Sequence, residues 1–173
     1  METLEVILSS GGHANSLGRA GEVLQLVRSN PERTGELFRC IYSEDAWVRM
    51  RAIDTFEKLV RENPVLAEPY IDAIFDDLTK INQASIQWHV AELFVELDLT
   101  EPQNKKAIKW LKDKISTSDV DWIVSVNTMR ALLHFCDKKL VNKDELMFLF
   151  KVQIGHKSKA VRKKATKFLE ALA

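Results

Sequence analysis

Apolar residues recur along this chain at helical spacing, and the same short pattern returns several times. Val48, Ala52, Phe56 and Leu59 lie four, four and three positions apart, which places them on one face of a helix. Equivalent patterns begin at three later residues, Ile86, Val124 and Val161. The four patterns therefore start 38, 38 and 37 residues apart. A period of this length is typical of stacked helical repeats, in which each unit buries its apolar face against its neighbours.

Almost the whole chain follows this helical pattern, and no segment alternates polar and apolar residues as a half-buried strand does. Helix breakers such as Asn30-Pro31 and Asn63-Pro64 separate the apolar stretches. Helices are predicted at residues 16–29, 31–42, 46–62, 67–81, 85–97, 103–116, 120–136, 143–154 and 158–172. Residues 1–15 include Ser9-Ser10-Gly11-Gly12 and are predicted to be a flexible lead-in.

The predicted helices pair into four antiparallel hairpins, and in each hairpin the second helix carries the repeated pattern. The hairpins cover residues 31–63, 64–99, 101–138 and 142–173, and helix 16–29 precedes them as a cap. We therefore expect an all-α protein with a single repeat domain over residues 16–173.

The second helix of each hairpin resembles the second helix of a HEAT repeat, which typically begins Asp-x-x-Val-Arg. Asp45-Ala46-Trp47-Val48-Arg49 matches this pattern. Asp121-Trp122-Ile123-Val124-Ser125 keeps the acid, Ser158-Lys159-Ala160-Val161-Arg162 keeps the arginine, and Gln83 to Gln87 keeps neither. The resemblance covers residues 31–173 and implies an armadillo-type solenoid, a right-handed α-α superhelix. At Met50-Arg51-Ala52, Gln87-Trp88-His89 and Val124 to Asn127 the chain is also similar to small stand-alone HEAT proteins of uncharacterised function, and this similarity implies no activity.

The charge of the chain sums to zero but is unevenly distributed. Residues 1–102 contain 9 Lys or Arg and 18 Asp or Glu, whereas residues 103–173 contain 16 and 7. In an elongated array, sequence order maps onto spatial order, so this imbalance predicts an acidic end and a basic end.

We expect no membrane span, because no apolar stretch reaches about 18 residues. Cys40 and Cys136 form no metal or redox motif, which favours a reduced, cytoplasmic location.

In HEAT solenoids the second helices line the concave face, and the residues opposite the buried pattern point into it. Counting each repeated Val or Ile as zero, these are positions +2, +6 and +9. They are charged in the outer repeats, as a wetted face is, but the middle repeats carry Trp88, Val95, Val126 and Leu133. Two interpretations stay open: a protein-binding patch, or a face buried by the curl of the superhelix.

Position +6 changes sign along the array and extends the candidate surface. It holds Asp54, Glu92, Arg130 and Lys167 in the four repeats. This stripe is either a solvated face with weak charge pairs or part of a groove for a partner of opposite polarity. The partner-binding residues predicted from the sequence are Arg51, Asp54, Trp88, Glu92, Val126 and Arg130. Trp88 is the strongest single anchor, because Trp is enriched among binding hot spots.

The basic C-terminal end suggests an alternative function in nucleic-acid binding. Its candidate phosphate-contacting residues are Lys159, Lys163, Lys164 and Lys167. The closest resemblance of this kind is to HEAT-like DNA-alkylation glycosylases, whose site needs a carboxylate beside aromatic residues. Asp119, Asp121 and Trp122 are the nearest match, although Asp121 also suits a helix-capping role.

The sequence carries no recognisable catalytic, metal-binding or cofactor-binding motif. The four histidines lie on separate elements without metal-ligand spacing, and neither a Gly-rich phosphate loop nor a Gly-x-Ser-x-Gly motif occurs. We therefore expect a non-enzymatic scaffold or adaptor that needs no metal or cofactor. Its expected partner is a protein or peptide bound on the concave face.

Overall fold

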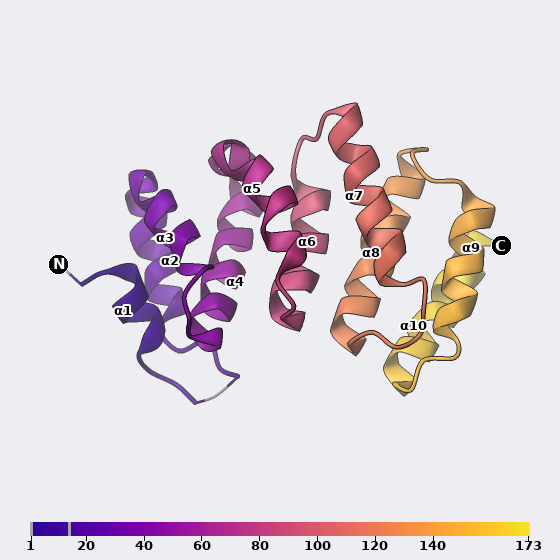
Figure 1. The fold of residues 1–173 in the computed structure, drawn as a ribbon, viewed down its shortest axis with the longest axis horizontal. Helices are drawn as coiled ribbons and strands as arrows, with labels where there is room; N and C mark the ends of the chain where they lie inside the picture. The colour runs from indigo at the N-terminus through magenta and orange to yellow at the C-terminus, as the bar shows by residue number, and fades with distance from the viewer. Residues whose placement is uncertain (1, 14) are drawn as a thin grey trace. The chain divides into compact units, whose positions relative to one another are not determined.

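The computed structural model describes residues 2–13 and 15–173, and these residues form helices and loops without any strand (Figure 1). The α-helices are α1 (Leu4–Ser9), α2 (Ala20–Ser29), α3 (Thr34–Cys40), α4 (Ala46–Glu62), α5 (Ile71–Asp76), α6 (Ala84–Glu96), α7 (Glu101–Lys114), α8 (Trp122–Asp137), α9 (Lys143–Gln153) and α10 (Lys159–Leu172). Three short 3-10 helices are η1 (Pro31–Arg33), η2 (Pro64–Tyr70) and η3 (Leu78–Lys80). The all-α class is confirmed.

The chain divides into two compact units, an N-terminal unit up to Ile71 and a C-terminal unit from Asp72. The boundary falls where the sequence predicted one continuous helix over residues 67–81. That segment is instead split into η2, α5 and η3. Pro69 lies inside η2 and has no N–H to donate, which prevents a regular α-helix there.

In the N-terminal unit, α4 is the central helix, and α1, α2, α3 and η2 pack against it. The repeated apolar positions of α4, from Val48 to Leu59, are at most 2% exposed. Three aromatic rings pack together in this unit. The Phe38 ring stacks on the Tyr70 ring, with centroids 4.3 Å apart, and contacts the Phe56 ring edge-on. Such pairs contribute about 0.5–1.5 kcal/mol each beyond their buried area.

The first 15 residues differ from the flexible lead-in that the sequence predicted, although residues 1 and 14 lie outside the described residues. Leu4–Ser9 forms α1, which Thr3 caps by accepting a hydrogen bond from the Val6 amide. Leu4, Ile7 and Leu8 are at most 2% exposed. The segment is therefore part of the core, because it buries three large aliphatic side chains.

In the C-terminal unit, α6 packs against α8, α7 packs against α8, and α9 packs against α10 (Figure 1). The repeated positions that begin at Ile86, Val124 and Val161 are buried, apart from a half-buried Leu169. Side-chain caps define the helix starts: Asp121 accepts from the Ile123 amide, and Asn142 accepts from the amides of the first turn of α9. Within the described residues, no helix combines the length and the apolar character that crossing a lipid bilayer requires.

Candidate functional site

One ion pair fixes the register between α6 and α8. The Arg130 guanidinium lies 3.2 Å from a Glu92 carboxylate oxygen, and the two residues are 38 positions apart, one full repeat. Their side chains are 56% and 17% exposed, so the pair lies at the surface. Equivalent positions of the two repeats therefore face each other across the two helices.

The apolar residues at positions +2 and +9 extend this surface in both directions along the two helices. Trp88 and Val126 lie one turn before the ion pair, and Val95 and Leu133 lie one turn after it. All four side chains are half-buried. We define the α6–α8 face as Trp88, Glu92, Val95, Val126, Arg130 and Leu133. The middle repeats thus present a partly exposed apolar strip with a central charge pair. The exposure of this strip is intermediate between the two interpretations of the sequence, a protein-binding patch and a buried face.

Trp88 is the largest apolar side chain of the α6–α8 face. Its indole stacks against the ring of His89, with centroids 3.4 Å apart, and His89 is only 1% exposed. The indole therefore contacts a buried neighbour and keeps part of its own surface in solvent. A half-exposed indole is suited to anchor a binding partner, because Trp is enriched among binding hot spots.

His134 borders the far end of the α6–α8 face. Desolvation lowers the pKa of its imidazole, the nearby Lys138 lowers it further, and the carboxylates of Asp137 and Glu96 oppose this change. Its Nε2 atom is buried and has no hydrogen-bond partner. The shift favours the neutral imidazole, so His134 itself adds no positive charge beside Leu133.

Arg51 and Asp54 are placed differently from the surface positions that the sequence predicted. Arg51 is 4% exposed, and its guanidinium donates to the carbonyl oxygens of Leu8, Gly11 and Ser16 at 2.5, 3.1 and 2.9 Å. Asp54 is 9% exposed and pairs with Lys58 at 2.7 Å. The physical reason is that α1 and α2 pack against α4 and cover this part of the helix. We therefore leave both residues out of the candidate surface.

Glu57, at position +9 of the same helix, is likewise buried and not on a wetted face. It is 2% exposed and forms an ion pair with Arg61. The expectation of a charged, solvated face in the outer repeats is therefore not met in the first repeat. It is met in the last repeat, where Lys163, Lys167 and Glu170 are exposed.

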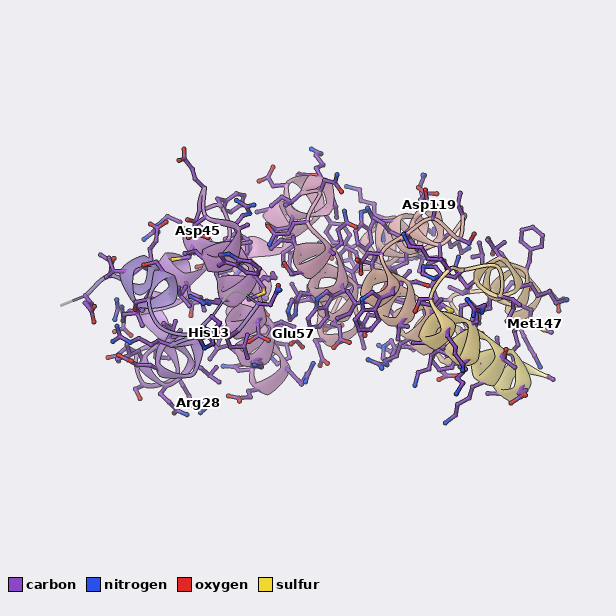
Figure 2. The ribbon with its side chains drawn as sticks, turned by 90° about the horizontal axis from the view of Figure 1, so that it is seen from below. His13, Arg28, Asp45, Glu57, Asp119 and Met147 are labelled. Atoms are coloured by element: carbon purple, nitrogen blue, oxygen red, sulfur yellow. The ribbon has the colours of Figure 1, made fainter. Side chains whose placement is uncertain are left out.

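The glycosylase-like combination does not form a catalytic arrangement. Asp121 is the N-cap of α8, and its carboxylate accepts the Ile123 amide at 2.9 Å. Asp119 is exposed in the loop that leads into α8 (Figure 2), and both aspartates line an open polar hollow of about 330 Å³. Trp122 is 51% exposed and does not line this hollow. The capping role that the sequence suggested for Asp121 is confirmed.

Two further hollows on the flanks of α7 were not predicted. One of about 350 Å³ lies between α7 and Leu140, and one of about 290 Å³ lies over Phe75 and Trp110. Leu140 is 46% exposed and follows two exposed lysines in the loop after α8. The Trp110 indole donates to the Thr79 carbonyl at 3.2 Å, which fixes one wall of the second hollow.

The basic helix α10 presents most of the lysines that the sequence assigned to nucleic-acid binding. Lys159, Lys163 and Lys167 are exposed. Lys164 is half-buried, and its ammonium lies over the Phe168 ring, 5.4 Å from the centroid. Three of the four candidates therefore share one exposed surface, and the fourth is drawn onto an aromatic ring.

The cysteines and potential metal ligands are dispersed. Burial raises the pKa of the Cys40 thiol to about 11, which disfavours the reactive thiolate. Among the residues that the structure describes, no group of three or more His, Cys, Asp or Glu side chains could hold a metal ion.

In comparisons with known proteins, no family model, no curated protein and no solved structure matches this chain.

Proposed function

We propose that the chain is a non-enzymatic, HEAT-like adaptor that binds a segment of another protein on the α6–α8 face. The observation that carries this proposal is the partly exposed apolar strip on both sides of the Glu92–Arg130 ion pair. In this proposal the hairpins stack as a right-handed α-α superhelix, and the α6–α8 face belongs to its concave side.

The chemistry of the face suits a short helical or extended protein segment. Apolar side chains of the segment contact Trp88 and Val126 at one end and Val95 and Leu133 at the other. Between them, Arg130 keeps 56% of its side chain exposed and can pair with a carboxylate of the partner. Apolar anchors surrounding one polar contact are the usual anatomy of a peptide-binding groove.

The test is a selection of displayed random peptides on the immobilised chain, followed by affinity measurements on variants. Trp88→Ala should weaken selected peptides about 30-fold, since hot-spot residues contribute about 2 kcal/mol or more. Phe148→Ala is the matched control, because Phe148 is a 68% exposed aromatic residue of the same unit that lies on α9 and not on α6 or α8. Circular dichroism establishes that both variants remain folded.

A second variant keeps the proposal testable if Trp88→Ala unfolds. Arg130→Glu changes a 56% exposed side chain and should leave the fold intact while weakening peptides that carry an acidic residue. The α6–α8 face is not the binding site if Arg130→Glu and Trp88→Ala bind the peptides as tightly as the unchanged chain does, or if Phe148→Ala weakens binding as much as Trp88→Ala.

A further inference from the structure

Lys159, Lys163 and Lys167 form a single stripe along the exposed side of α10. They are four residues apart, so each lies one helical turn beyond the last, about 6 Å further along the axis. The opposite side of the helix is held in the core by Val161 and Ala165, both 0% exposed. The stripe therefore has a fixed direction, because the helix that carries it cannot rotate without exposing apolar residues.

Like most lysines of the C-terminal unit, these three have no carboxylate partner in the described part of the chain. By contrast, the exposed lysines of α7 are largely neutralised. Lys105 pairs with Glu101, and Lys109 pairs with Asp113, both at 2.6 Å. The lysine stripe of α10 therefore projects uncompensated positive charge, and the positive N-terminal end of the helix dipole adds to it near Lys159.

The neighbouring charged groups do not neutralise the stripe, and an acidic residue follows it at one end. Arg162 is turned away, since its guanidinium donates to the carbonyl oxygens of His156 and Lys157 at 2.8 Å each. Glu170 is exposed on the same side, one turn beyond Lys167. The lysine stripe, defined as Lys159, Lys163 and Lys167, is thus about 12 Å long and ends at an acidic residue.

The surroundings of the stripe distinguish between the possible polyanions. A membrane-bound helix needs apolar side chains to insert, and the apolar residues of α10 face the core. Single-stranded nucleic acid is held by stacking on exposed aromatic rings, whereas Phe168 is half-buried and lies beneath the Lys164 ammonium. A duplex needs neither feature, because its phosphates can be contacted by lysines alone.

We propose that the lysine stripe of α10 is a binding site for the phosphate backbone of double-stranded nucleic acid. About 12 Å of duplex carries about four phosphates on one strand, enough to contact all three ammonium groups. Contacts to phosphates carry no sequence information, so this binding is independent of sequence. This site is separate from the α6–α8 face, and its test does not depend on the proposed adaptor function.

The test measures fluorescence anisotropy of a labelled 20-base-pair duplex between 50 and 200 mM NaCl. With three phosphate contacts the affinity should fall about 40-fold over this range, from a slope of about −0.9 per contact. The slope in question is that of the logarithm of the binding constant against the logarithm of the salt concentration. The variant Lys159→Gln/Lys163→Gln/Lys167→Gln should reduce its magnitude by about 2.7. The expected result is that this loss is the same for duplexes of unrelated sequence.

The matched control removes the same number of charges from another helix of the same unit. Lys105→Gln/Lys109→Gln/Lys112→Gln changes three ion-paired lysines of α7 and should leave both affinity and slope nearly unchanged. Equal losses in the two triple variants would show that binding follows net charge and would overturn the proposal.

Two other results would also overturn it. Tighter binding of a single strand of equal length would show that bases and not duplex phosphates are recognised. Displacement of the duplex by an equal charge concentration of poly-glutamate would show that the stripe serves an acidic protein.

Discussion

The Ser125 hydroxyl donates a 2.9 Å hydrogen bond to the side-chain oxygen of Gln153, and both residues are fully buried. The Gln153 amide nitrogen donates in turn to the carbonyl oxygens of Ile115 and Thr117, at 2.9 and 2.8 Å. One glutamine of α9 therefore satisfies a serine of α8 and the backbone of the loop that leaves α7. Because a buried polar group is costly only when it lacks partners, this network fixes that loop in a single arrangement.

Replacing Gln153 by Leu should therefore destabilise the protein by about 3 kcal/mol, since it leaves the Ile115 carbonyl and the Ser125 hydroxyl buried without this partner and also removes the hydrogen bond to the more exposed Thr117 carbonyl. Ser125→Ala removes only one hydrogen bond and should cost about 1 kcal/mol. Urea unfolding at neutral pH measures both values. Equal costs for the two variants would indicate that water replaces the glutamine and that the network contributes little.

The paired helices and their buried faces could be predicted from the sequence because helical spacing alone determines them. Val48, Ile86, Val124 and Val161 are all at most 1% exposed. Helix starts were predictable where a short polar side chain precedes the apolar pattern, as at Asp45 and Asp121, which both cap their helices. The Glu92–Arg130 ion pair joins residues 38 positions apart, which is the spacing of these repeated positions.

The sequence did not predict in the same way which segment packs against α4. Helical spacing gives the angular position of Arg51 and Asp54 on the helix, but it does not say which other element covers that side. The covering element is the N-terminal segment, whose Gly11, Gly12 and Ser10 look like a flexible linker. Its order depends on contacts with a residue 40 positions away, and such contacts leave no local pattern.

The Arg51 side chain should hold the N-terminal segment in place. Gly18 has φ +49°, and a Cβ there would lie 2.9 Å from the Arg51 guanidinium carbon and 2.6 Å from the Gly11 carbonyl oxygen. We therefore expect Gly18→Ala and Arg51→Lys each to loosen residues 10–19, the first by crowding and the second by losing the planar fork of donors.

Hydrogen–deuterium exchange of peptides from this segment measures the effect of both variants. Exchange over residues 10–19 should rise at least about tenfold in each, which corresponds to about 1.4 kcal/mol of local stability. Gly21→Ala is the control, because a Cβ at Gly21 meets no atom within 4 Å. Unchanged exchange in Arg51→Lys would show that the segment is held by α1 packing alone.

The lowered pKa of His134 should make stability depend on pH in the range just below neutrality. The folded state disfavours the charged imidazole, mainly through desolvation. As pH falls through the ordinary imidazole value of 6.5, the unfolded chain binds a proton that the folded chain does not. Stability therefore decreases as the pH falls from 6.5 toward the lower folded-state pKa, and it is unaffected by this group well above 6.5.

Urea unfolding at pH 7.5, 6.5 and 5.5 measures this dependence. His134→Gln should flatten the loss of stability over this range, whereas His13→Gln, at an exposed position, should not. The ordinary carboxylate value of 4.5 lies below the measured range, so protonation of Glu36 or Glu62, whose pKa values are lowered further, does not interfere. A slope that persists in His134→Gln would assign the pH dependence to another group. Because His134 follows Leu133 directly, a flattened slope would also locate the pH-sensitive group at the edge of the α6–α8 face.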